Sequence, residues 1–170
     1  LYLFDTASQR YLRIWIGPHE GEQIRLQLAG TPTTRPMTYR YFADFLQAMG
    51  IQLEAVCVAR LHEFTYYAVT QFRNGDLVKE LDARPSDAIG LALHTGSPIF
   101  VDDELMAQSG EALAAGVDVD RWFTKEVERL QTEQLTLTSW QAELFKEGEA
   151  AFTQRARSAL QQAIALAQSF

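Results

Sequence analysis

Alternating hydrophobic and polar positions predict most of the strands of this 170-residue chain. The alternation covers residues 11–16 and 51–61, and in each segment it produces one apolar face that can be buried. Residues 64–72 are aromatic and β-branched, and the dipeptide Asn74-Gly75 that follows them favours a tight hairpin turn. Residues 77–83 should therefore return antiparallel, so that the last three of these segments form a meander.

Apolar residues that recur every three or four positions predict helices between the strands. Pro18 and Pro85 each suit the first turn of a helix, and Gly30 and Gly96 suit the ends of the same two helices. A further helix is expected to begin with Thr38 as its N-cap and to pack on the sheet through one apolar stripe. The stripe consists of Tyr41, Phe42, Phe45, Leu46 and Met49.

Two shorter apolar segments complete the predicted sheet, and a different pattern follows them. Residues 1–4 should pair with the first strand, and residues 99–101 predict a brief inner strand. After Gly116, apolar positions around Trp122 predict one helix, and a longer amphipathic helix is expected from Trp140 onward. The expected fold is an α/β domain of the α+β kind. It has a mixed, largely antiparallel sheet flanked by helices over residues 1–108, and a C-terminal helical extension of open role over residues 109–170.

The charge distribution changes what the net charge of −7 implies about partners. Residues 1–101 contain nine basic and ten acidic side chains, whereas residues 102–170 contain six and twelve, so most of the acidity lies in the tail. Eight of the nine basic residues in the first segment are arginines, which are well suited to bidentate contacts with phosphate or carboxylate groups. A nucleic-acid partner is therefore compatible with the first segment, and scattered surface charge is the alternative.

The compartment follows from apolar runs and cysteine content. No apolar run approaches the roughly 20 residues that span a bilayer, so no membrane partner is expected. Cys57 is the single cysteine and cannot form an internal disulfide, and its place in the alternating strand predicts an inert core thiol. These observations favour a cytoplasmic protein.

Candidate chemistry gathers where the meander passes into the helix that begins at Pro85. Asp82, Arg84 and Asp87 surround this strand-to-helix junction, where free backbone N–H groups and the helix dipole favour anions. Metal-assisted or phosphate-directed chemistry needs such a set of carboxylates and a guanidinium. The same residues also suit a helix cap and a structural ion pair. Glu20 occupies the matching position in the helix that Pro18 begins, so it too is either a functional carboxylate or a helix cap.

Three other residues have the chemistry to join the same site or a catalytic triad. Arg35, in a loop before Pro36, could add a phosphate-binding cation, and His19 is a candidate general base or metal ligand or simply a surface histidine. Ser86 has no recognisable His–Asp partners, and the sequence contains no nucleophile elbow, P-loop or dinucleotide-binding glycine motif. Acyl transfer and nucleotide-cofactor chemistry are therefore not expected.

Four segments in the same order resemble the bifunctional nuclease family, long catalogued as a domain of unknown function. They are YLRIWIGPHE from Tyr11, TRPMT from Thr34, DARPSDAIGLAL from Asp82 and PIFV from Pro98. The resemblance covers about residues 1–108 and implies a mixed sheet flanked by helices, frequent self-association and nuclease activity on DNA and RNA. The chain departs from the family pattern where it has Tyr39-Arg40 in place of His-Asp, and where Glu63-Phe64-Thr65 replaces Asp-Gly-Thr.

Two hypotheses of function follow. In the first, the protein is a divalent-metal-dependent phosphodiesterase in which Glu20, Asp82 and Asp87 hold Mg²⁺ or Mn²⁺ and activate water, while Arg84 and Arg35 bind the phosphate of a nucleic acid. In the second, the same residues are capped and ion-paired architecture, and the protein is a non-catalytic homo-oligomeric binding or regulatory module. The missing His-Asp pair and the acidic composition favour the second hypothesis, and the family resemblance favours the first.

Overall fold

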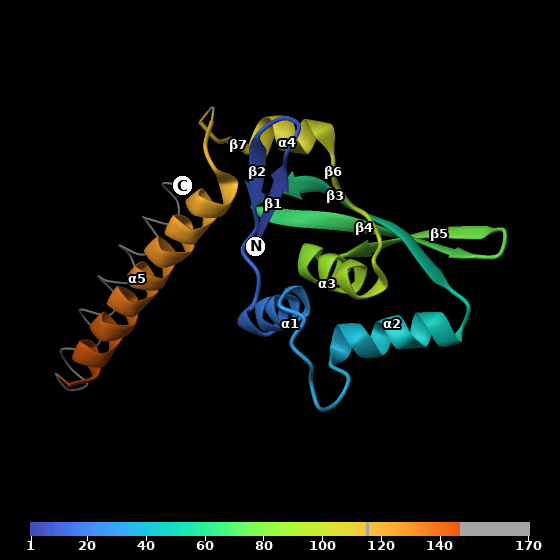
Figure 1. Ribbon diagram of the computed structural model, residues 1–170, viewed down its shortest axis with the longest axis horizontal. Coiled ribbons are helices and arrows are strands. Elements are labelled where there is room, and N and C mark those ends of the chain that lie inside the picture. Colours follow the sequence, from blue (N-terminus) through green and yellow to red (C-terminus); the bar gives the residue numbers. More distant parts are fainter. Residues whose placement is uncertain (115, 147–170) are drawn as a thin grey trace. The chain divides into compact units, whose positions relative to one another are not determined.

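The computed structural model describes residues 1–114 and 116–146, which fall into two units (Figure 1). One compact unit ends at Ala115 and the other begins at Gly116. The described part of the second unit contains helix α5, Val119–Lys146. Within the described residues, no helix is long and apolar enough to cross a bilayer.

A four-stranded sheet forms the framework of the first unit (Figure 1). The meander predicted from the sequence is confirmed, because neighbouring strands in it pair antiparallel and Asn74 and Gly75 lie at the turn between its last two strands. The inner strand at residues 99–101 pairs parallel with the first strand of the meander, which makes the sheet mixed. In spatial order the strands are β5 Leu77–Ala83, β4 Thr65–Asn74, β3 Gln52–His62 and β6 Ile99–Val101.

A second, three-stranded sheet contains the opening hairpin. The predicted pairing of the first two strands is confirmed, with Leu3 opposite Leu12. A short third strand adds to this hairpin antiparallel, so that the strands divide between two sheets, which the sequence pattern did not indicate. These strands are β1 Tyr2–Asp5, β2 Arg10–Arg13 and β7 Glu111–Ala112.

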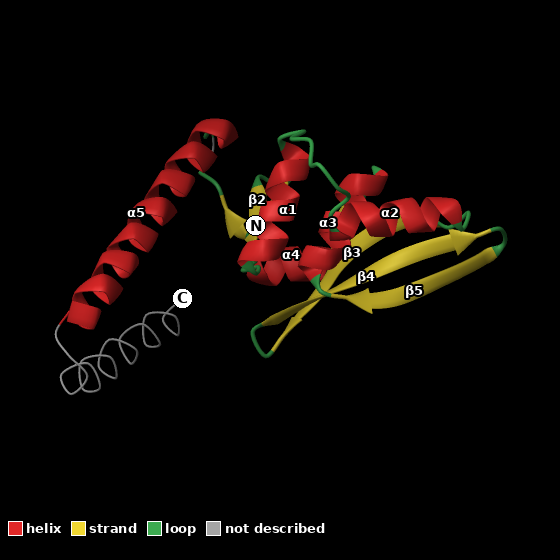
Figure 2. Ribbon diagram, turned by 90° about the horizontal axis from the view of Figure 1, so that it is seen from below, coloured by secondary structure: helices red, strands yellow, loops and turns green. Residues whose placement is uncertain are grey.

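Three helices of eleven residues each position the candidate site, and Figure 2 shows them on one side of the larger sheet. Helix α3 packs on β3 and β4, and both α1 and α2 contact α3. The buried core includes Val56 and Val58 of the sheet, Ile89 of α3 and Leu12 of the opening hairpin. The helices are α1 Pro18–Leu28, α2 Thr38–Ala48, α3 Pro85–Thr95 and a short α4 Asp103–Ser109.

The predicted buried stripe of α2 is wrong in all but one position. Leu46 is buried, whereas Tyr41, Phe42, Phe45 and Met49 are 68%, 42%, 47% and 57% exposed. The buried face of the helix is instead made by a second set of positions at helical spacing, namely Tyr39, Ala43 and Leu46. Helix α2 therefore has two apolar arcs, and only one of them meets the sheet.

Two boundaries also differ from the prediction. The N-cap of α2 is Met37, and no side chain caps the helix, so Thr38 is its first helical residue rather than its cap. The two helices expected around Trp122 and from Trp140 are one continuous helix, α5. No glycine or proline interrupts residues 130–140, so nothing in this segment breaks the helix. The predicted continuation of the second helix beyond residue 146 lies outside the described residues.

Candidate functional site

The predicted junction places Arg84 and Asp87 together at the start of α3. Arg84 is the residue before the helix, and Pro85 occupies the first helical position, where a missing N–H leaves no hydrogen bond unmade. The guanidinium donates from Nε to Oδ2 of Asp87 at 2.6 Å and from Nη2 to Oδ1 at 3.0 Å. This fork-to-fork geometry fixes the orientation of both groups and raises the pKa of Arg84.

Glu20 reaches the same guanidinium from α1. Its Oε1 lies 3.0 Å from Nη2 of Arg84, and its side chain is 20% exposed against 66% for Arg84. The carboxylate folds back over Gly17, where a Cβ atom would collide with it. Glu20 and Asp87, each in the first turn of its helix, therefore converge on one cation from two different helices.

Tyr39 of α2 completes this group, which we call the carboxylate cluster: Glu20, Tyr39, Arg84 and Asp87. The Tyr39 hydroxyl donates to Oδ1 of Asp87 at 3.1 Å. Burial and the neighbouring Asp87 charge raise the pKa of Tyr39, so the phenol stays protonated and serves as a donor. A Cβ atom at position 90 would collide with the Tyr39 ring, so Gly90 of α3 is what allows this approach.

Asp82 and His19 lie apart from these contacts. Asp82 is exposed on β5 opposite Val69, and strand alternation puts it on the other face of the sheet from Ala83, which packs on the core beneath the helices. His19 is exposed in the first turn of α1. Among the described residues, neither side chain forms a hydrogen bond or an ion pair with Arg84 or Asp87. No group of three or more described His, Cys, Asp or Glu side chains comes together to hold a metal ion.

The family model of the bifunctional nuclease domain matches residues 1–114. The chain belongs to the bifunctional nuclease domain family. This confirms the resemblance seen in the four sequence segments. The family match continues past residue 108 to residue 114, and the first compact unit continues to residue 115.

Two similar proteins come from strains of Mycobacterium tuberculosis, and both are described as uncharacterized. Each is 38% identical to this bifunctional nuclease domain protein over 110 residues, which make up 65% of this chain. The matched region also spans 65% of the length of these curated relatives. The family supports a nuclease-related role, and the names of these two relatives state no activity.

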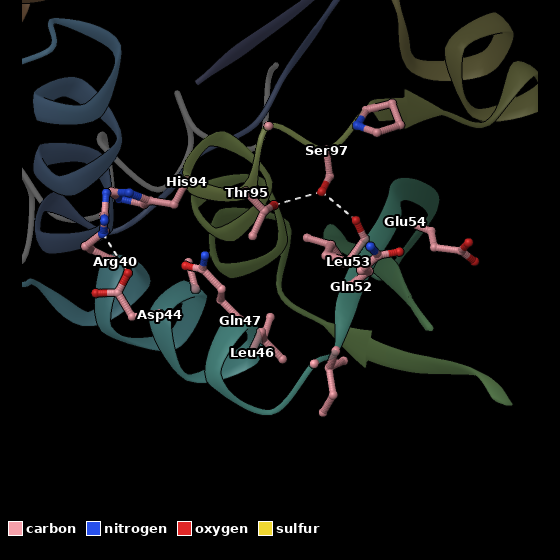
Figure 3. Close-up of a pocket in the computed structure, with 15 residues that line it drawn as sticks. Arg40, Asp44, Leu46, Gln47, Gln52, Leu53, Glu54, His94, Thr95 and Ser97 are labelled. Atoms are coloured by element: carbon pink, nitrogen blue, oxygen red, sulfur yellow. Dashed lines mark hydrogen bonds and ion pairs between the residues drawn. The ribbon is translucent and has the colours of Figure 1, made fainter. Parts of the chain in front are cut away.

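The bifunctional nuclease domain has two hollows beside the carboxylate cluster rather than at it. The larger, about 750 Å³, lies where α2 and α3 end and β3 begins, and Figure 3 shows Arg40 joined to Asp44 with His94 beside them. The smaller, about 470 Å³, is lined by the end of α1, the loop 30–37 and the start of α2, and it contains Arg35. Arg40, Asp44 and His94 line both hollows.

Sequence reasoning missed three residues that shape this region of the domain. In the sequence Tyr39 and Arg40 stand out only as departures from the family pattern. Tyr39 nevertheless begins the helical spacing with Ala43 and Leu46 that identifies the buried face of α2. Gly90 gave no signal, because a helical glycine has no special meaning until the ring packed against it is known.

Proposed function

We propose that this protein hydrolyses phosphodiester bonds of DNA or RNA and that the carboxylate cluster is its catalytic centre. The observation that carries the proposal is the convergence of Glu20 and Asp87 on Arg84, within a domain of the bifunctional nuclease family. Two carboxylates beside a guanidinium provide a general base and a phosphate-binding cation in one place.

In the proposed reaction, Arg84 exchanges a carboxylate partner for the substrate phosphate. Its guanidinium is 66% exposed, and phosphate accepts the same fork of N–H donors as Asp87 does. The released carboxylate then accepts a proton from the water that attacks phosphorus. The departing oxygen takes up a proton from solvent as its bond to phosphorus breaks, and the carboxylic acid afterwards returns its proton to solvent. Tyr39 holds Asp87 in position by its hydroxyl donor during this exchange.

A divalent ion is compatible with the pair of carboxylates. Mg²⁺ is commonly held by one or two carboxylates together with substrate phosphates, so Glu20 and Asp87 would hold Mg²⁺ or Mn²⁺ once substrate is bound. Such an ion would supply charge stabilisation at the phosphate and lower the pKa of a bound water. Asp82 and His19 remain proposed participants. Neither is bonded to the carboxylate cluster in the structure, so each would have to approach it when substrate binds.

The test is cleavage of single- and double-stranded DNA and RNA with Mg²⁺, with Mn²⁺ or with chelator. Glu20→Gln and Asp87→Asn should each lower the rate, by about 100-fold or more if the carboxylate acts as the general base. The matched control is Glu22→Gln on the same helix, where the glutamate pairs with Arg25 away from the cluster. Cleavage by the Glu20→Gln, Asp87→Asn double variant at the rate of the control would overturn the proposal.

Variants of the two outlying residues decide whether the centre is larger. Asp82→Asn and His19→Gln should lower cleavage only if these side chains join the cluster when substrate binds. Rates within twofold of the Glu22→Gln control would remove both residues from the centre.

Cys57 is a free thiol in the structure, which fits the proposed cytoplasmic location, where thiols stay reduced.

A homo-oligomeric binding or regulatory module is a second candidate, favoured by the exposed arc of α2. Phe42 and Phe45 stack with their ring centroids 6.3 Å apart, and both rings face away from the core. A run of exposed aromatic side chains is typical of interaction surfaces. Sedimentation of the Phe42→Ser, Phe45→Ser variant tests this: a wild-type oligomer that becomes smaller supports the candidate, and an unchanged mass removes this arc as its interface.

A further inference from the structure

The hollow at the end of α1 has the size and lining of a binding site for an anion. Its volume of about 470 Å³ falls within the range of ordinary small-ligand sites, roughly 300–1,000 Å³. Its walls carry the Thr34 hydroxyl and the Gln23 side-chain amide, which can donate hydrogen bonds to phosphate oxygens. Two further polar side chains of the wall already donate within the protein, Thr33 to the carbonyl of Arg35 and Gln27 to the carbonyl of Leu93. We call it the loop hollow, and Arg35 is part of its lining.

The charge inside the loop hollow is positive, in contrast to the chain as a whole. Arg35 is exposed and forms no ion pair within the described part of the chain, whereas Arg40 pairs with Asp44 at 2.9 Å. Burial, and then the charge of Arg40, lower the pKa of His94, while Asp44 acts in the opposite direction. His94 is therefore mainly neutral at pH 7, and Arg35 supplies the uncompensated charge.

The loop hollow is linked to the carboxylate cluster through α1 and α2. One face of α1 carries Glu20, Gln23 and Gln27, which are spaced three and four residues apart. Glu20 belongs to the carboxylate cluster, and the two glutamines line the loop hollow. Gln23 also accepts from the backbone N–H of Tyr39 at 3.5 Å, and the hydroxyl of Tyr39 reaches Asp87. Along the helix axis Glu20 and Gln27 are about 10 Å apart.

That separation suits a nucleic-acid strand. A stacked strand rises 3.4 Å per nucleotide, so about 10 Å corresponds to roughly three nucleotides. A strand whose scissile phosphate lies at Arg84 could therefore place a nearby phosphate in the loop hollow. Arg84 is shared by two carboxylates, but Arg35 is unpaired among the described residues, so Arg35 can bind phosphate without first breaking an ion pair. Arg40 would share its guanidinium between Asp44 and the phosphate.

We infer that the loop hollow binds a phosphate group that flanks the scissile phosphate of the nucleic acid, through Arg35 and Arg40. The inference rests on the proposed function because it defines the flanking phosphate by the bond that the carboxylate cluster cleaves. The same chemistry would accept the phosphate of a free mononucleotide, and the two sources are distinguished by ligand length. Among the described residues that line the hollow, Arg35 and Arg40 are the cations at pH 7.

The binding test uses the full chain and fluorescein-labelled phosphorothioate oligonucleotides that resist cleavage. Arg35→Gln and Arg40→Gln should each weaken binding several-fold, and loss of one phosphate contact should reduce the slope of log K against log salt by about 0.7. The control is Arg25→Gln, since Arg25 also forms an exposed helical ion pair, with Glu22, but lies outside the hollow. Affinity and slope equal to those of the control would overturn the inference.

A length series separates the inference from the proposed function. A dinucleotide has one internal phosphate, and a hexanucleotide has several. Arg35→Gln should therefore weaken binding of the hexanucleotide but not of the dinucleotide, while adenosine monophosphate should compete only weakly with the hexanucleotide. Equal loss for both lengths, or strong competition by the mononucleotide that depends on Arg35, would contradict a flanking-phosphate site. Because these ligands are not cleaved, the result does not depend on whether the carboxylate cluster is catalytic.

Discussion

Two arginines of the first compact unit have opposite surroundings. Arg84 donates to Asp87 and Glu20, and the pair of helices α1 and α3 holds both carboxylates in place. Arg35 lies in the loop between α1 and α2, exposed and without an ion pair among the described residues. A cation shared by two anions is positioned but neutralised, whereas a cation in a loop is available but poorly positioned. The difference suggests chemistry at Arg84 and attraction of substrate at Arg35.

The contrast is tested most directly by making the same substitution at both positions. Arg84→Gln should lower kcat/KM for oligonucleotide cleavage about 100- to 1,000-fold, the usual effect of removing a donor that stabilises charge in the transition state. Arg35→Gln should instead raise KM and leave kcat within about twofold, because uniform binding does not lower the barrier of the bound complex. Steady-state kinetics over a range of substrate concentrations separates the two effects. Equal changes in kcat at both positions would remove the distinction between them.

How far the sequence predicts these two regions depends on how local each signal is. Pro18 and Pro85 begin helices because proline fixes its own φ, and Gly75 lies in the turn that joins two strands because glycine accepts its positive φ. Arg84 and Asp87 are three residues apart, so one helical turn brings them together. These features need no knowledge of distant segments.

The rest depends on contacts between helices, which a single sequence does not specify. Two arcs of α2 have apolar spacing, and the arc with Tyr39 is buried because Gly90 leaves room for its ring. Glu20 meets Arg84 only because α1 packs beside α3, 64 residues later in the chain. The same packing leaves Arg35 in a separate hollow, although sequence reasoning assigned it to the same phosphate as Arg84.

Stability should respond strongly to a side chain added beneath the carboxylate cluster. Gly90→Ala puts a methyl group into the ring of Tyr39 and should lower the free energy of unfolding by about 1–3 kcal/mol, as overpacking does. Urea denaturation measures the change. Gly21→Ala is the matched control, because its Cβ would lie 3.5 Å from Ile16, an ordinary contact, and alanine favours a helix. A destabilisation at position 90 no greater than at position 21 would show that the ring is not held there.

A smaller change is expected when only the Tyr39 hydroxyl is removed. Tyr39→Phe deletes the donor to Asp87 but leaves both bonds from Arg84, so the free energy of unfolding should fall by about 0.5–1.5 kcal/mol. Cleavage should fall with it, since Asp87 loses one of the groups that orient it. Tyr41→Phe on the same helix provides the control, because Tyr41 is 68% exposed. Equal stability of the two variants would mean that the hydroxyl does not hold Asp87.

The smallest expected effect is a pH dependence of stability from His94, at the border of the two hollows. Burial and the charge of Arg40 lower the pKa of His94 in the folded protein, and the charge of Asp44 opposes them. In the unfolded chain the pKa of a histidine is near 6.5. As the pH falls, the unfolded chain therefore protonates His94 before the folded protein does. The free energy of unfolding should therefore decrease as the pH falls from 7.5 through 6.5 towards the lower folded pKa. His94→Gln should flatten this part of the profile. Parallel slopes for wild type and His94→Gln in urea titrations at each pH would contradict the assignment.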